Sequence, residues 1–326
     1  MNYMARRKSN KIQPAALTLT TATSTVAPGA TGQFTIDLSQ MASIVNRRFY
    51  RQGLNWAVAG FKILAPQGIS GQVATLQLPN SWVTSNAWEK GMRTWLRQQD
   101  DAIEEAGLES AVARFRDFKI HMDKTHVDDT FTANLLPLDG QLPIAQDYAV
   151  GEWNNSLVVI PNDGGVAGNT QEFSLHMVGD DDPAPQQSKG LIKAYAESRS
   201  FPQSPDPVTP AGAETSLFVE MFDTGMNQEE VVDNAIDRND NLPYPQADYP
   251  GGDTQAPSLV IHDISTISST TIGGITRLKG GNFPCGLIRV NWANAAESST
   301  SANLTIIIDL VPGHHRGYLA ESMVEM

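Results

Sequence analysis

Short alternating segments dominate the hydrophobic pattern of this chain. Residues 32–38 place Phe34, Ile36 and Leu38 on one face, and residues 73–78 form a similar run. A period of two residues is typical of a β-strand with one buried face. Strands are also expected at residues 17–26, 54–64, 113–122, 153–160, 172–178, 258–264 and 286–292, and at 304–311, which is a nearly continuous apolar run and so a buried strand. With about nine or ten short strands, the chain is expected to be all-β.

One segment has a helical period instead. Between residues 85 and 107, apolar side chains recur three or four positions apart, among them Trp88 and Trp95. The segment begins at a serine and ends at a glycine, which are common residues at helix ends. We expect the two tryptophans to pack on the sheet, although a stacking platform for bases or sugars is the alternative.

The order of these elements indicates the architecture. Strands do not alternate with helices along the chain, which argues against a parallel α/β sheet. We therefore expect an antiparallel β-sandwich, and among sandwiches a single jelly roll, with one inserted helix and long loops. Residues 1–13 are predicted to form a flexible basic arm, and residues 14–326 a single domain with a long loop insertion around residues 179–257.

Charge is unevenly distributed along the chain. The formal net charge is −13, but residues 1–62 hold eight Lys and Arg residues against one Asp. That segment therefore has a charge of +7, and the remaining 264 residues have −20. We expect a basic side that can meet phosphate and an acidic side. One cysteine and no apolar run of about 18 residues predict a soluble protein without disulfides or membrane insertion.

Two basic segments are candidates for nucleic-acid binding. Residues 5–11 of the arm contain four cations and no acid, and residues 46–51 read Asn-Arg-Arg-Phe-Tyr-Arg. Interleaved arginine and aromatic side chains are typical of surfaces that hold nucleic acid, although such a short segment alone is also typical of a solvated entry to a strand. We predict contacts to phosphate from Arg6, Arg7, Lys8, Lys11, Arg47, Arg48 and Arg51.

The aromatic residues near the second basic segment are expected to divide between surface and core. Phe49 and Tyr50 lie among the arginines and are the candidates for stacking on a base. Trp56 and Phe61 belong to the strand that follows, and we expect them in the core of the sandwich.

Residues that commonly catalyse reactions follow no catalytic pattern here. The sequence contains no Gly-x-Ser-x-Gly, no phosphate-binding glycine loop before a helix, and no His/Cys cluster with metal-ligand spacing. Cys285 lies in a Phe-Pro-Cys-Gly turn without an assignable base. We predict no enzymatic activity, no cofactor and no metal. Surface positions are expected for His121, His126, His314, His315 and the aspartates at 180–182.

Four segments spread over the chain suggest a family. They are the basic arm at 5–11, the arginine segment at 46–51, Asp-Asn-Leu-Pro-Tyr-Pro at 240–245, and Leu-Val-Pro-Gly-His-His-Arg-Gly-Tyr-Leu-Ala at 310–320. Together they resemble the capsid proteins of small circular Rep-encoding single-stranded DNA (CRESS-DNA) viruses. No single motif is diagnostic, and the arm has four cations where many relatives have a much longer arginine-rich arm.

The resemblance implies a structural protein of the virion. It would self-assemble into a small icosahedral shell and enclose single-stranded DNA, without sequence specificity, through a basic inner face. Its partners would be copies of itself and the genome, and the host nucleus would be a further location during assembly. The alternative is a carbohydrate-binding or adhesin-type β-sandwich, or a glycoside hydrolase, although no carboxylate pair is singled out. Its sugar platform would consist of Trp82, Trp88, Trp95 and Trp153.

Overall fold

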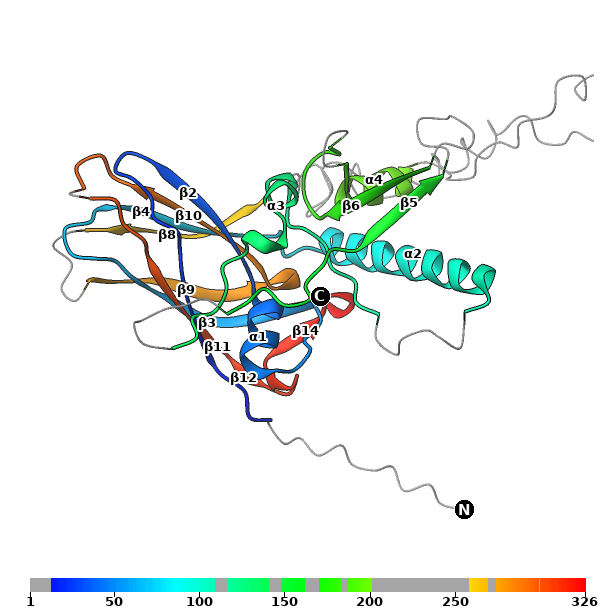
Figure 1. The fold of residues 1–326 in the computed structure, drawn as a ribbon, viewed down its shortest axis with the longest axis horizontal. Coiled ribbons are helices and arrows are strands. Elements are labelled where there is room, and N and C mark those ends of the chain that lie inside the picture. The colour runs from blue at the N-terminus through cyan, green and yellow to red at the C-terminus, as the bar shows by residue number, and fades with distance from the viewer. Residues whose placement is uncertain are drawn as a thin grey trace, which may run out of the picture.

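Two curled antiparallel sheets form the larger part of the protein (Figure 1). The computed structural model describes residues 13–108, 116–140, 148–161, 170–182, 187–200, 258–268, 274–298 and 300–326. Helix α2 (Trp82–Ala106) extends from one end of the sheets, and a smaller layer of strands and helix lies beside it. The fold is mostly β, and its sheets agree with the expected antiparallel β-sandwich.

Each large sheet is built from strands far apart in the sequence. In the first sheet β1 pairs with β11 and β11 pairs with β3. Strand β14 pairs with the first residues of β3, and β9 pairs with most of its length. The second sheet has the order β2-β10-β4-β8. All of these pairs are antiparallel. The first sheet comprises β1 (Thr18–Ala22), β3 (Leu54–Leu64), β9 (Ile275–Phe283), β11 (Thr305–Leu310) and β14 (Ala320–Ser322). The second comprises β2 (Thr31–Asp37), β4 (Gly71–Gln77), β8 (Val260–Ile267) and β10 (Leu287–Asn294).

The main core lies between these sheets and takes apolar side chains from the strands of both. In β10, for example, Ile288, Val290 and Trp292 are all fully buried. Trp56 and Phe61 of β3 are 0% and 1% exposed, so their predicted core positions are confirmed. Burying one such side chain stabilises the fold by about 1.5–3 kcal/mol.

A second core joins the insertion to the end of the sandwich. The insertion occupies the chain between β4 and β8, and its buried cluster includes Trp88, Trp95 and Phe118 together with Leu287 and Met323 from the sandwich side. Its elements are α2, α3 (Lys124–Asp129), β5 (Leu157–Pro161), β6 (Thr170–His176), β7 (Ser188–Gly190) and α4 (Leu191–Ser200). The remaining short elements are the 3-10 helices Phe131–Ala133, Pro284–Gly286 and Met323–Glu325, and the hairpin of β12 (Pro312–Gly313) and β13 (Gly317–Tyr318).

The prediction of a single inserted helix is wrong. Helix α1 (Leu38–Asn46) directly follows β2, because the Asp37 carboxylate accepts hydrogen bonds from Ser39 N (2.9 Å) and Gln40 N (3.2 Å) and so caps the first turn. Helix α4 likewise lies in the region expected to be a loop insertion, most of which is outside the described residues. Helix α2 begins at Trp82 rather than Ser85 and ends at Gly107 as predicted.

Residues 116–122 do not form the expected strand. They make only an isolated bridge between His121 and His176, although the alternating pattern continues through them. The Gln52 side chain takes the place of a neighbouring strand, since its amide accepts from Ile120 N (2.7 Å) and donates to the Ile120 carbonyl (3.0 Å). A buried side-chain amide therefore ties this segment to the sandwich.

Candidate nucleic-acid interface

The arginine cluster (Arg47, Arg48 and Arg51) follows helix α1 at the surface. Arg47 ends the helix in a left-handed conformation, with φ of 50°, and its N–H bonds to the Ile44 carbonyl. Beyond this turn the chain leads into β3, and the three arginines and Phe49 are exposed. The three predicted residues of this segment therefore lie together where a ligand can reach them.

Tyr50, in contrast, is fully buried. Its hydroxyl donates to the Arg316 carbonyl (3.0 Å), and its ring centroid lies 5.8 Å from that of Trp56 and 5.4 Å from that of Tyr318. Burial raises the pKa of Tyr50, so the hydroxyl stays a neutral donor. The prediction that Tyr50 can stack on a base is wrong, because its ring anchors the segment. Phe49, at 36% exposure, remains available.

The N-terminal segment leaves the fold beside the arginine cluster. The Arg48 guanidinium donates to the Pro14 carbonyl (3.0 Å), and Ala16 N donates to Asn46 Oδ1 (2.9 Å). The Tyr318 hydroxyl donates to the Ala16 carbonyl (2.6 Å), and burial raises the pKa of Tyr318 to about 12, which keeps this donor protonated. The arm therefore starts next to the cluster. Its predicted phosphate contacts lie outside the described residues: Arg6, Arg7, Lys8 and Lys11.

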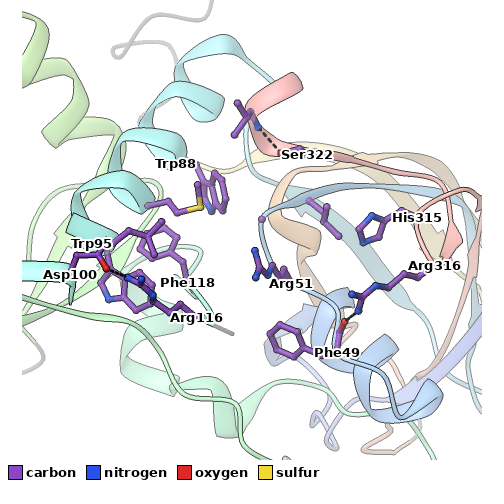
Figure 2. Close-up of a pocket in the computed structure, with 15 residues that line it drawn as sticks. Phe49, Arg51, Trp88, Trp95, Asp100, Arg116, Phe118, His315, Arg316 and Ser322 are labelled. Atoms are coloured by element: carbon purple, nitrogen blue, oxygen red, sulfur yellow. Dashed lines mark hydrogen bonds and ion pairs between the residues drawn. The ribbon is translucent and has the colours of Figure 1, made fainter. Parts of the chain in front are cut away.

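A pocket of about 550 Å³ opens next to the cluster, between α2, the start of β3 and the C-terminal segment (Figure 2). Its lining combines aromatic rings with cationic groups. The aromatic rings are those of Phe49, Trp88, Trp95 and Phe118, and the cationic groups are those of Arg51, Arg116 and Arg316. In Figure 2, Arg51 lies between the wall that contains Trp88 and Phe118 and the wall that contains Arg316.

Positive charge beside this pocket is not neutralised. Arg116 pairs with Asp100 at 2.6 Å, but no carboxylate of the described residues lies within ion-pair distance of Arg316 or the arginine cluster. The Arg316 guanidinium instead donates to the Phe49 carbonyl. Burial, with a further contribution from Arg316, lowers the pKa of His315, so that ring is neutral at pH 7. This side of the molecule is suited to bind an anion.

Sequence reasoning missed Arg316 and Arg116 as members of this site. His314 and His315 were expected at the surface, and no role was predicted for Arg316, but β12 and β13 pair and turn Arg316 back toward Phe49. Gly317, with φ of 109°, permits that tight turn and was the local signal. Nothing local indicates that Arg316 and Phe49 meet, because 267 positions separate them in the sequence.

The prediction that His121 and His126 are surface residues is wrong. Both are buried, at 3% and 0% exposure, and His176 lies with them. His126 Nδ1 accepts from Met122 N (3.0 Å), so its other ring nitrogen donates to Asn134 Oδ1 (2.9 Å) and the ring is neutral. Burial lowers the pKa of His121 to about 4 and lowers the pKa of His126 as well. Among the described residues, no group of three metal-ligating side chains is placed to hold a metal ion.

Two further predicted surface or turn residues are buried. Asp182 is 3% exposed and pairs with Lys124 at 2.9 Å, so it belongs to the packing of the insertion rather than to a solvated loop. Cys285 is completely buried, and burial raises the pKa of its thiol well above the ordinary value. A thiol in that environment is protonated and is a poor nucleophile.

Three of the four tryptophans of the alternative sugar platform, Trp88, Trp95 and Trp153, are buried. Trp88 and Trp95 are 4% and 6% exposed and pack around Phe118, with ring centroids 5.8 and 5.5 Å from its ring. Trp153 is 6% exposed, and its indole N–H donates to Asp37 (3.0 Å). These rings do not form the flat exposed surface that sugar binding by stacking requires.

Comparison of the chain with protein-family models, curated proteins and solved structures finds no match. Among the helices of the described residues, none combines the length and the apolar character needed to cross a membrane.

Proposed function

We propose that this chain is the shell-forming capsid protein of a small circular single-stranded DNA virus, and that the arginine cluster lies on the inner face of the shell. The observation that carries the proposal is the position of the cluster: three exposed arginines without a carboxylate partner in the described structure lie beside the start of the basic arm. The resemblance noted in the sequence supports the same function.

The order of the strands supports a single jelly roll. Eight strands follow one another through the sandwich as β1, β2, β3, β4, β8, β9, β10 and β11. The first of these pairs with the last, and the second with the last but one. This nested pairing, split over two sheets, is the connectivity expected of two combined Greek keys. The insertion between β4 and β8 supplies the helix and the second core.

DNA would bind mainly through its phosphates. The guanidinium groups of the cluster and the cations of the arm would each replace a counterion, so affinity falls as the salt concentration rises and does not depend on sequence. For a single strand, the logarithm of the binding constant falls with the logarithm of salt by about 0.7 per phosphate contact.

Assembly requires apolar surface outside the protein's own core, and β8 offers it. This strand is an edge of its sheet, and its residues Val260, Ile261 and Ile264 are 44%, 57% and 44% exposed. An exposed apolar edge strand is typical of a surface that another chain covers. We propose that a second copy covers it in the shell, so that Ile261→Lys reduces assembly without unfolding the subunit.

Imaging tests the proposal directly. The full chain should form uniform closed particles by electron microscopy in the presence of single-stranded DNA at low salt. Deletion of residues 1–13 should reduce the DNA content of the particles more strongly than it reduces their assembly. The opposite result would show that the arm serves assembly rather than packaging, and a monomer under every salt condition, with or without DNA, would refute a capsid.

A further inference from the structure

The pocket beside the arginine cluster has the size of a ligand site. Its volume of about 550 Å³ lies within the range of roughly 300–1,000 Å³ that small-molecule sites occupy. Four separate parts of the chain form its walls: helix α2, residues 49–54, residues 116–118, and residues 315–324. A bare phosphate would fill only part of such a space, so a ligand that fills the pocket has a further group besides phosphate.

One wall is aromatic. Phe118 packs between Trp88 and Trp95, and all three rings line the pocket (Figure 2). The indole N–H groups of both tryptophans are buried without a hydrogen-bond partner in the described structure. A buried indole N–H usually has a partner, so this wall has unused donors as well as apolar area. Phe49 adds a partly exposed ring to the lining.

The opposite side is cationic. Arg51 and Arg316 both line the pocket and have no carboxylate partner among the described residues, while the carboxylate of Asp100 is used by Arg116. Guanidinium groups bind phosphate through several parallel hydrogen bonds. A ligand that satisfies both sides therefore combines an anionic group with a flat aromatic group.

We infer that this pocket, which the two tryptophans help to line, is a subsite for one nucleotide, with the base on Phe49 and the phosphate at Arg51 and Arg316. The inference rests on the proposed function, in which the nucleotide belongs to the packaged strand. A single-stranded chain can present an unpaired base in this way because its bases are not held in a duplex. The subsite selects for an aromatic base and not for sequence, since every base has a face that can stack.

Comparison of two DNA strands tests the subsite. Binding of the full chain to a fluorescently labelled oligothymidylate and to an abasic strand of equal length would be measured by anisotropy at fixed salt, with dTMP, inorganic phosphate and a neutral oligosaccharide as competitors. We expect about tenfold tighter binding of the oligothymidylate. The preference should fall to near unity in Phe49→Ala, whereas Arg51→Gln should weaken both strands. Arg277→Gln, at an exposed arginine of β9, is the matched control and should change neither.

The outcomes separate the subsite from the proposed function. Equal binding of the two strands, or a preference that survives in Phe49→Ala, overturns the subsite and leaves phosphate binding intact. Competition by phosphate as strong as by dTMP also overturns it, and so does competition by the oligosaccharide. Binding of dTMP without binding of either strand supports a nucleotide pocket and contradicts the packaging of DNA. Circular dichroism of each variant establishes that it is folded.

Discussion

Acidification should destabilise the folded subunit through its buried histidines. His121 is the clearest case, because its ring is 3% exposed and stacks on Phe131 with centroids 4.3 Å apart. Burial, and then the neighbouring His176, lowers the pKa of His121 to about 4 from the ordinary 6.5. Between these two values the unfolded chain binds a proton that the folded protein does not, so stability falls as pH falls from 6.5 toward 4.

The size of this effect follows from the two pKa values. For His121 alone, the linkage relation gives a loss of about 1.2 kcal/mol at pH 5.5 and about 2.5 kcal/mol at pH 4.5, relative to pH 7. His126 and His176 also have lowered pKa values and add to the loss. The Arg289–Asp123 ion pair is a further charged group at this cluster, since Arg289 contributes to lowering the pKa of His126.

One buried acid opposes the histidines. Burial raises the pKa of Asp37 from 3.8 to about 6 although Ser39, Gln40, Gln52 and Trp153 donate to its carboxylate. As the pH falls, the folded protein therefore binds this proton at a higher pH than the unfolded chain does. Acidification from pH 7 to 4.5 stabilises the folded protein through Asp37 by about 2 kcal/mol. The total pH dependence mixes both signs. A comparison of variants isolates the histidine contribution.

His121→Phe is the informative variant. Phenylalanine keeps the stacking on Phe131, and the hydrogen bond that the change removes is the one between the His121 side chain and the His126 backbone. The free energy of unfolding of the unassembled subunit would be measured by urea denaturation at pH 7, 5.5 and 4.5. We expect the variant to lose about 2.5 kcal/mol less than the wild type at pH 4.5. The exposed His314→Gln is the control. Identical losses in wild type and His121→Phe would refute the reasoning.

Three further predictions concern the cap, the pocket wall and the cluster. Asp37→Ala should destabilise the subunit by about 2–4 kcal/mol in urea denaturation, because it removes the cap of α1 and leaves buried donors unpaired; a loss below about 1 kcal/mol would contradict this role. Gly53→Ala should cost about 1–3 kcal/mol, since a Cβ there would lie 2.1 Å from the Trp88 ring, and an unchanged melting temperature would show that the ring moves freely. Replacing all three arginines of the cluster by glutamine should make the slope of the logarithm of the DNA-binding constant against the logarithm of the salt concentration shallower by about 2. An unchanged slope would place the phosphates elsewhere. The substitutions are Arg47→Gln, Arg48→Gln and Arg51→Gln, with Arg93→Gln as the control.

The strands were largely predictable, because their side chains alternate and one face is buried. In β2, Phe34 and Ile36 of the predicted face pack on the main core, although Thr35 and Asp37 are buried as well. The pattern failed where side chains form hydrogen bonds with backbone groups that would otherwise pair with a neighbouring strand. Gln52 bonds to residue 120 in place of a neighbouring strand, and Asp37 starts a helix at Leu38, the last residue of the predicted strand.

The site was predictable only in part. The arginines of the cluster are adjacent in sequence, so their charge and exposure could be anticipated from a short segment. The pocket could not be predicted from the sequence, because Arg316 and Trp88 reach Phe49 only through the pairing of distant strands and the docking of α2. Tyr50 was misassigned for a related reason: its burial depends on Tyr318, far away in the sequence.

The central claim is that copies of this chain enclose single-stranded DNA through the arginine cluster and the adjoining arm. Its most direct test is the amount of nuclease-protected DNA in purified particles of the full chain. We predict uniform particles that contain protected single-stranded DNA, with a large loss of that DNA when the cluster is replaced by glutamine. A chain that stays monomeric, or particles whose DNA is fully digested by nuclease, would contradict the claim.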